Sequence, residues 1–200
     1  MTGLWIAIGV LVVLLVALLA GGLLALAMGR LHLDLGWGRS VHRLGPLQMR
    51  IEAPRELVYE ILSAPYLGRA RSESIDVLAR GESLVVASHL TKVHFYEART
   101  VEAIDLEPPA RMGFRHLTGP VPYALEEFRL EQEAEETELH YDGELAIDFF
   151  LIGRIAGRRW VIPQWHRAVG EHLAAVKAQA EQRAQRARSR DSADDPGRDD

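Results

Sequence analysis

The chain of 200 residues contains no cysteine and no asparagine. The absence of cysteine excludes a disulfide scaffold, a cysteine-ligated zinc site, a thiol nucleophile and an iron–sulfur cluster. Without asparagine the chain has no N-glycosylation site. Lysine is scarce as well, with two residues against 21 arginines. We interpret this bias as the codon usage of a GC-rich, bacterial genome rather than as a functional signal.

One long apolar run contrasts with the charged remainder of the chain. From Leu4 to Met28 the sequence has 25 residues without a charged side chain. As a helix this run would be about 37 Å long, enough to cross a hydrocarbon core of about 30 Å. We therefore expect residues 4–28 to form a transmembrane helix. A cleaved signal peptide is the alternative, but no basic side chain precedes the run, and the run is longer than a usual signal-peptide core.

The charges that flank this run indicate its orientation. Arg30, Arg39 and Arg43 follow it, and no charged side chain precedes it. By the positive-inside rule, the segment after the helix lies in the cytoplasm. The sequence thus predicts a single-pass protein of the cell membrane with a cytoplasmic globular domain. Residues 29–45 contain four glycines and are expected to form a linker.

The remaining charges are divided unevenly along the chain. Residues 46–148 have a net charge of −10, residues 149–190 of +7, and the last ten residues of −4. A protein that binds nucleic acid usually presents a broad basic surface. An acidic body with one basic helix therefore indicates no nucleic-acid partner.

The hydrophobic pattern after the linker predicts an α+β domain. Alternation of apolar and polar residues over 47–51 predicts a short strand. A helix is expected to begin at Pro54, where the missing N–H costs nothing, and to end at residues 63–65. Between Ser72 and Phe149 we expect six strands with short connections, which together make an antiparallel sheet.

The last two of these strands indicate which residues face the interior. In the final strand, Tyr141 and Leu145 share the inward parity. In the strand before it, Tyr123 falls on one parity and Phe128 on the other. If both point inward, the strand contains an extra residue, so we expect a β-bulge near residues 126–127.

Residues 150–188 have a helical pattern, which Gly153, Gly157 and Pro163 divide into a short helix and a longer one starting near Pro163. Beyond Ala178 the residues favour a helix but form no apolar face. We therefore place the end of the domain at residue 178. Residues 179–200 are expected to form a helical extension and then, from residue 191, a disordered acidic tail.

The order of these elements, with the opening segment IEAPRELVYEILSAP at residues 51–65, resembles the START-like, or SRPBCC, superfamily. Within it the polyketide cyclase/dehydrase-like group is most similar. The resemblance covers residues 46–178 and implies a helix-grip fold, in which a curved antiparallel sheet of about seven strands surrounds a long C-terminal helix. It also implies a hydrophobic cavity between sheet and helix. Relatives bind lipids, sterols, polyketides or other apolar molecules, and only some catalyse a reaction; the N-terminal anchor departs from the simplest members.

Motifs for catalysis or cofactor binding are missing from the sequence. It contains neither a Gly-x-Ser-x-Gly motif nor a serine beside a convincing base. His-Glu-x-x-His is absent, and the spacing of His89 and His94 is not that of a recognised metal site. The glycine-containing segments lack the strand–turn–helix context of a phosphate-binding loop. We expect no metal and no cofactor, and we assign no catalytic residue.

The predicted inward faces provide candidate residues for a ligand cavity. These are His94, Tyr96, Met112, Phe114, His116, Tyr123, Tyr141, Leu145 and Trp165. A buried His116 needs a hydrogen-bond partner, which Tyr123 or Tyr141 could supply. His116 is then the polar end of the cavity, a general acid–base, or a core histidine without a further role. Gly143 shares the inward parity, so Gly143→Trp is expected to fill cavity space with a modest loss of stability.

Two groups of charged residues have alternative interpretations. Side chains of the adjacent pairs at 126–127 and 135–136 point to opposite sides of a strand, so neither pair can act as a glycosidase pair. We expect these glutamates on a solvated face. Arg154, Arg158 and Arg159 follow an apolar segment, and they either contact anionic lipid or pair with the acidic sheet.

Three functions are compatible with these features. The leading hypothesis is membrane-anchored binding of a hydrophobic small molecule or lipid in the helix-grip cavity. The second is a polyketide cyclase/dehydrase-like enzyme, and the third is an interaction module without a ligand. The sequence gives no indication of the oligomeric state.

Overall fold

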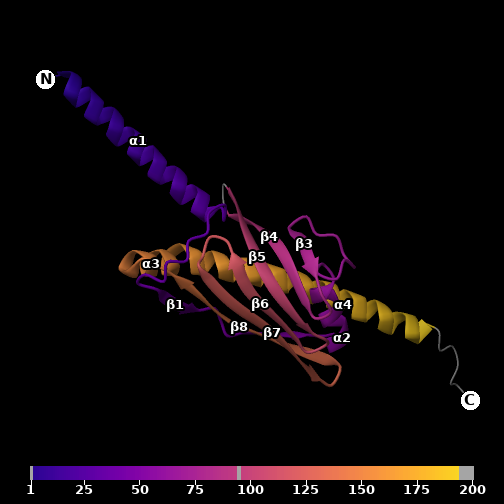
Figure 1. The fold of residues 1–200 in the computed structure, drawn as a ribbon. Coiled ribbons are helices and arrows are strands. Elements are labelled where there is room, and N and C mark those ends of the chain that lie inside the picture. Colours follow the sequence, from indigo (N-terminus) through magenta and orange to yellow (C-terminus); the bar gives the residue numbers. More distant parts are fainter. Residues whose placement is uncertain (1, 94–95, 194–200) are drawn as a thin grey trace, which may run out of the picture.

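The computed structural model describes residues 2–93 and 96–193, which form one projecting helix and an α+β domain (Figure 1). His94, a cavity candidate, lies outside the described residues. The predicted acidic tail also lies outside them from residue 194 onward.

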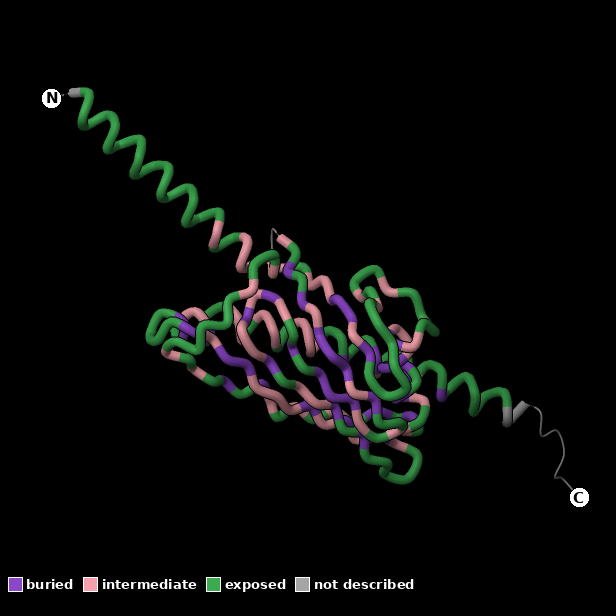
Figure 2. The backbone as a smooth tube through the Cα atoms, in the orientation of Figure 1, coloured by how far each residue is buried: buried purple, intermediate pink, exposed green. Residues whose placement is uncertain are grey.

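Helix α1 (Thr2–Ala27) projects from the domain, and its most apolar stretch buries no residue against it (Figures 1 and 2). It is long and apolar enough to cross a membrane. The absence of burial distinguishes it from a core helix, because a helix of such composition in water would bury its side chains. At its carboxyl end, the backbone N–H of Arg99 donates to the carbonyl of Met28 at 3.0 Å. The helix is therefore connected directly to the sheet.

Eight strands form one antiparallel sheet with the order β1-β8-β7-β6-β5-β4-β3, and β2 also pairs with β8. The strands are β1 (Ser40–Arg43), β2 (Leu47–Ile51), β3 (Ile75–Arg80), β4 (Leu84–Val93), β5 (Tyr96–Glu107), β6 (Arg111–Thr118), β7 (Tyr123–Glu133) and β8 (Glu136–Ile147). The predicted strand at 47–51 and the six strands after residue 72 are confirmed. Strand β1 is the additional one, and it lies within the segment that we expected to be a linker.

The predicted bulge at residues 126–127 is absent. Strand β7 pairs with β8 from Tyr123 to Glu133 without a register shift. Residues of even number, including Ala124 and Phe128, therefore face the interior, and Tyr123 faces the outer side. The prediction was wrong because it assumed that the aromatic Tyr123 points inward and the charged Glu126 outward.

Two helices, one before β3 and the long one near the carboxyl end of the chain, lie on the concave side of the sheet. Helix α2 (Arg55–Ser63) begins one residue after Pro54, which is its N-cap, and ends at Ser63 close to the predicted position. After β8 follow α3 (Phe150–Ala156), a π-helical turn η1 (Gly157–Val161) and the long α4 (Ile162–Ala193). Figure 1 shows α4 running along the sheet. The helix-grip fold predicted from the sequence is confirmed.

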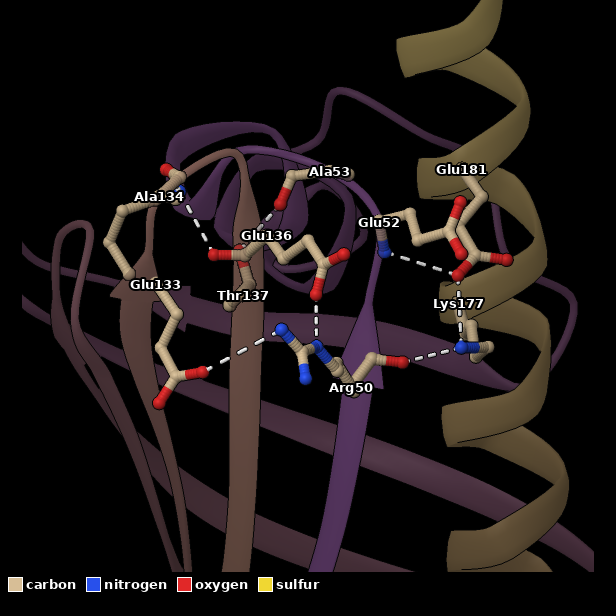
Figure 3. Close-up of polar contacts among 10 residues, drawn as sticks. Arg50, Glu52, Ala53, Glu133, Ala134, Glu136, Thr137, Lys177 and Glu181 are labelled. Carbon is tan, nitrogen blue, oxygen red and sulfur yellow. Dashed lines mark hydrogen bonds and ion pairs between the residues drawn. The ribbon is translucent and has the colours of Figure 1, made fainter.

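Small side chains extend the core along α4 beyond the predicted end of the domain. Leu173, Val176, Ala180 and Ala184 are buried at helical spacing. At the same level, Lys177 donates to the carbonyl of Arg50, and Glu181 accepts from the N–H of Glu52 at 3.1 Å (Figure 3). The sequence suggested no apolar face here because alanine was not counted as a core residue.

Residues 29–39, which we call the strap, connect α1 to the sheet and are held against the domain. Asp148, 2% exposed, accepts hydrogen bonds from the N–H groups of Leu35 and Gly36, each at 2.9 Å. The guanidinium of Arg39 donates to the same carboxylate at 2.8 Å. The strap is therefore fixed where β8 meets α3.

Candidate functional site

The concave face of the sheet contains a group of ionisable side chains, centred on Glu126 of β7. The carboxylate of Glu126 accepts hydrogen bonds from the hydroxyl of Tyr141 at 2.6 Å and from the indole N–H of Trp165 at 2.8 Å. Tyr141 lies on the neighbouring strand β8, and Trp165 lies on α4. Sheet and helix are thus linked through one carboxyl group.

Burial raises the pKa of Glu126 to about 7, and the negative charge of Glu102 adds to this effect. The two hydrogen bonds oppose the shift without cancelling it. Near neutral pH the group is therefore divided between its protonated and ionised forms, as a proton donor or acceptor in a reaction requires.

Glu126 was expected on a solvated face, and this expectation was wrong. Its partner across the β7–β8 ladder is Gly143, which has no side chain to occupy the same space. A Cβ at position 143 would lie 3.1 Å from the Cγ of Glu126 and 2.7 Å from the carbonyl oxygen of Leu125. The pairing thus leaves room for Glu126 on the inner face. These short distances also contradict the prediction that Gly143→Trp would fill empty cavity space.

Glu102 of β5 places a second carboxyl group on the same face. Its oxygen lies 2.9 Å from Nδ1 of His89 on β4, and its side chain is 10% exposed. Burial alone would raise the pKa of Glu102, but the hydrogen bond and charge of His89 outweigh burial and lower it. Glu102 is therefore held ionised, in contrast to Glu126.

Two further rings border these carboxyl groups. Tyr66, which follows α2, packs edge-on against His89 with ring centroids 5.7 Å apart. Burial, followed by the charges of Glu102 and Glu126, raises the pKa of Tyr66. On α4, desolvation by surrounding protein lowers the pKa of His172, and nearby His89 adds to the shift, although His172 keeps an exposed surface. The Nε2 atom of His89 has no hydrogen-bond partner among the described residues.

His116 is buried, as its parity predicted, but the predicted tyrosine partners do not bind it. The hydroxyl of Tyr141 donates to Glu126, and that of Tyr123 donates to Glu144 on the outer face at 2.8 Å. Desolvation lowers the pKa of His116, although Glu102 and the Val121 backbone counteract it. Neither ring nitrogen has a hydrogen-bond partner of good geometry among the described residues.

The other predicted cavity residues divide between core and site. Met112 and Leu145 are fully buried members of the hydrophobic core, and Phe114 packs edge-on between Tyr66 and Phe128. Trp165 contacts the site through Glu126. Tyr96 is the first residue of β5, at the end of the inner face. The sequence prediction missed Tyr66, His89, Glu102 and Glu126, although His89 and Glu102 share the inward parity of apolar neighbours.

Arg154, Arg158 and Arg159 do not belong to this site. They are exposed on α3 and η1. No ion pair links any of them to an acidic side chain among the described residues, which disfavours pairing with the acidic sheet. The described residues also contain no group of three or more histidine, aspartate and glutamate side chains placed to bind a metal ion.

A hollow of about 340 Å³ lies on the outer side of the sheet. Its lining is dominated by charged residues, among them Arg111, Glu127 and Asp142. An apolar ligand would gain little from such a surface, because most of its contacts would be with hydrated charges. We therefore assign the candidate site to the concave face.

The sequence matches no protein-family model and no curated protein. Among solved structures, the Zhui aromatase/cyclase from Streptomyces sp. R1128 matches with a TM-score of 0.59 at 21% identity, covering 72% of this chain and 95% of that one. TTHA0849 from Thermus thermophilus matches with a TM-score of 0.57 at 18% identity, covering 70% and 97%. A START superfamily protein from Mycobacterium smegmatis gives 0.50 at 16% identity, covering 71% and 97%.

These similarities concern the fold, since each identity is low. They cover most of each solved chain, so the whole domain takes part in the match and not one motif of it. The order of strands and the position of α4 agree with the same architecture. The chain therefore has the helix-grip fold of START-like, polyketide cyclase-like proteins, preceded by an apolar N-terminal helix.

Proposed function

We propose that this protein binds a hydrophobic small molecule or lipid on the concave face of its helix-grip domain, anchored to the membrane by α1. The observation that carries the proposal is the buried group formed by His89, Glu102 and Glu126. Burying ionisable side chains is costly, so they occur inside proteins mainly where a ligand or reaction uses them. The ligand would place its apolar part along the sheet and a polar group at Glu126.

The accessibility of the site supports this proposal. Desolvation by surrounding protein is the largest cause of the pKa shifts of Glu126 and His172, yet neither side chain is fully closed to solvent. Glu126 is half-buried and His172 is exposed, so part of each surface is open to solvent. The Nε2 atom of His89 is buried without a hydrogen-bond partner among the described residues, so the site contains an unsatisfied polar group.

Mass spectrometry of the intact full-length chain, extracted in mild detergent, tests the binding. We expect a co-purified apolar molecule on the parent protein and a reduced amount on Glu126→Gln. Glu127→Gln is a matched control, because the adjacent side chain lies on the outer face and pairs with Arg111. An equal absence of bound molecules from all three proteins would refute the proposal, as would equal occupancy of all three.

The anchor is tested separately. The positive charges that follow α1 favour a cytoplasmic domain. Protease added to intact cells should then leave residues 40–200 uncut. Digestion from outside would overturn the orientation, and a mature chain starting near Met28 would identify α1 as a cleaved signal peptide.

A second candidate function is cyclase-like catalysis, which the opposite pKa shifts of the two carboxyl groups favour. A depressed pKa in Glu102 and a raised pKa in Glu126 suit a base and an acid, respectively. Turnover of a linear poly-β-ketone that falls as the pH rises through about 7 would support this function. A lack of turnover by the ligand-binding protein would leave binding as its role.

A further inference from the structure

Helix α3 and the turn η1 attach to the domain by glycine and direct their large side chains away from it. A Cβ at Gly153 would lie 1.7 Å from the carbonyl oxygen of Asp148, and one at Gly157 would lie 2.8 Å from Ile147. At Gly153 the contact is with backbone, so only glycine permits it, whereas at Gly157 the contact is with the end of the Ile147 side chain. The large apolar side chains on the other sides are exposed, namely Phe150, Leu151, Ile152, Ile155 and Trp160. Ile152 is 77% exposed and Trp160 is 62% exposed.

The strap presents a similar surface beside α3. Leu31, Leu33, Leu35 and Trp37 occupy every second position of the strap, and all four are exposed. A residue between these apolar positions holds the strap in place, because Nδ1 of His32 lies 3.2 Å from the carbonyl oxygen of Gly119. These four side chains, which we call the apolar strip, extend along the chain from the end of α1 to the contact of Trp37 with Phe150 of α3.

The strip and α3 are joined at strained residues. Trp37 packs edge-on against Phe150, with ring centroids 5.3 Å apart. Phe149 and Phe150 have φ angles of 75° and 50°, which bulky residues rarely adopt. Their N–H groups donate to the carbonyls of Trp37 and Gly38 at 2.8 and 3.0 Å, which holds this geometry. Backbone strain of this kind persists where surrounding structure enforces it, and it often marks functional segments.

The charges on the α3 and η1 part of this surface have one sign. Between residues 149 and 170 there are four arginines and no acidic residue. Arg154, Arg158 and Arg159 lie among the exposed apolar side chains without an ion pair among the described residues. Exposed aromatic and aliphatic groups beside free arginines complement a bilayer surface, where acyl chains lie beneath anionic phosphates.

The direction of α1 places this surface at the membrane. Figure 1 shows that α1 and α3 lie at the same end of the domain, while α2 and the β7–β8 turn lie at the other. The strap connects the two helices over that end. If α1 spans the bilayer, the apolar strip begins where the hydrocarbon ends.

We propose that the outer surface of α3 and η1, with the apolar strip of the strap, is a second membrane-contact site that binds the anionic surface of the bilayer crossed by α1. The inference rests on the proposed anchoring by α1. The domain then lies against the membrane in one orientation, with α3 in the interface. Because α1 already confines the domain, the second contact is intramolecular and needs little affinity of its own.

Spin labels test this proposal well, because the chain has no native cysteine. Single cysteines are introduced into the full-length chain as Ile152→Cys, Leu78→Cys and Val13→Cys, and each protein is placed in nanodiscs containing anionic lipid. Leu78 is a matched control, since it is an exposed aliphatic residue on β3. Collisions with oxygen, which concentrates in lipid, are compared with collisions with a water-soluble nickel chelate.

We expect the label at 152 to be accessible to oxygen and protected from the nickel chelate, and the label at 78 to show the reverse. Combined Arg154→Gln, Arg158→Gln and Arg159→Gln substitutions should reduce the protection at 152, as should replacing the anionic lipid with a neutral one. If the label at 13 lies in lipid while the label at 152 lies in water, the second contact is overturned and the anchor stands. A label at 13 outside lipid would overturn the anchor itself. Protection at 152 with dipolar broadening between labels, irrespective of lipid charge, would assign the surface to a second copy and contradict the proposal.

Discussion

The concave face of the sheet and the outer surface of α3 violate the usual distribution of side chains in opposite ways. On the concave face, Glu102, Glu126 and His116 are enclosed by a hydrophobic core. On α3, phenylalanine, leucine and isoleucine side chains are exposed to solvent. The buried charges lower stability and the exposed apolar side chains favour association, and proteins retain such features where function requires them. The comparison underlies the two proposals made above, an inner site for the polar part of a ligand and an outer site for a bilayer.

The largest expected difference between the two regions is in the cost of removing an apolar side chain. Leu145 is fully buried, so Leu145→Ala should lower the free energy of unfolding by about 2–5 kcal/mol. Ile152→Ala should change it by less than about 0.5 kcal/mol, because the side chain is exposed. Chemical denaturation of the full chain in mild detergent measures both values. Similar losses in the two variants would show that α3 packs against something within the protein.

The next effect concerns the inner site and depends on pH. The pKa of Glu126 is about 7 in the folded protein against an ordinary value of 4.5, so folding favours its protonated form. The stabilisation is complete below pH 4.5 and is lost as the pH rises toward 7, by about 3 kcal/mol at most. Glu126→Gln should remove this loss and gain stability relative to the parent between pH 5 and 8. Parallel pH profiles for the two proteins would contradict the raised pKa.

A smaller effect is expected where the strap meets the domain. The hydrogen bond from Arg39 is the main cause of the lowered pKa of Asp148, and the N–H groups of Leu35 and Gly36 add to it. Asp148→Asn should cost about 1.5–3 kcal/mol at pH 7, as expected for a hydrogen bond to a charged group. The difference should shrink as the pH falls below 3.8 and through the folded pKa, because the parent carboxylate then becomes protonated.

Proteolysis provides a local readout of the same change. Trypsin should cleave after Arg39 faster in Asp148→Asn than in the parent, because the ion pair of Arg39 with the buried Asp148 is lost, although its pair with Asp34 remains. Asp142→Asn is the control, since among the described residues the carboxylate of Asp142 accepts a hydrogen bond from the adjacent Gly143 and from no part of the strap. Equal cleavage of all three proteins would mean that Asp148 does not hold the strap.

The smallest effects come from a matched pair of tyrosines on opposite faces of the sheet. Tyr141→Phe removes a hydrogen bond to the enclosed Glu126, and Tyr123→Phe removes one to the accessible Glu144. We expect a cost of about 1–2 kcal/mol for Tyr141→Phe and about 0.5 kcal/mol for Tyr123→Phe, because solvent replaces only the outer bond. Tyr141→Phe should also shift the pH profile of Glu126 upward, since its hydrogen bond opposes protonation. Equal costs would indicate that Glu126 is hydrated.

The sequence by itself determined the elements and their order. Alternation over residues 47–51, the proline before α2 and the glycines before the long helix depend on local periodicity and backbone preference, and all correspond to the observed boundaries. The uncharged run likewise predicts α1 from composition alone. On the last strand, the inward parity of Tyr141 and Leu145 is confirmed, because polar residues alternate with apolar ones along nearly its whole length.

Only the tertiary structure decided which charged residues enter the interior. Glu126 lies inward because the β7–β8 register sets it opposite Gly143 and because Tyr141 and Trp165 satisfy its carboxylate. Those partners come from a neighbouring strand and a distant helix, so no local pattern contains them. The same holds for β1 and the strap, whose glycine-rich sequence suggested a linker. Strand β1 is held by pairing with β8, and the strap is held by hydrogen bonds to Asp148, more than 100 residues away in the sequence. Local periodicity reports the average polarity of a face, whereas a single buried charge depends on contacts made across the fold.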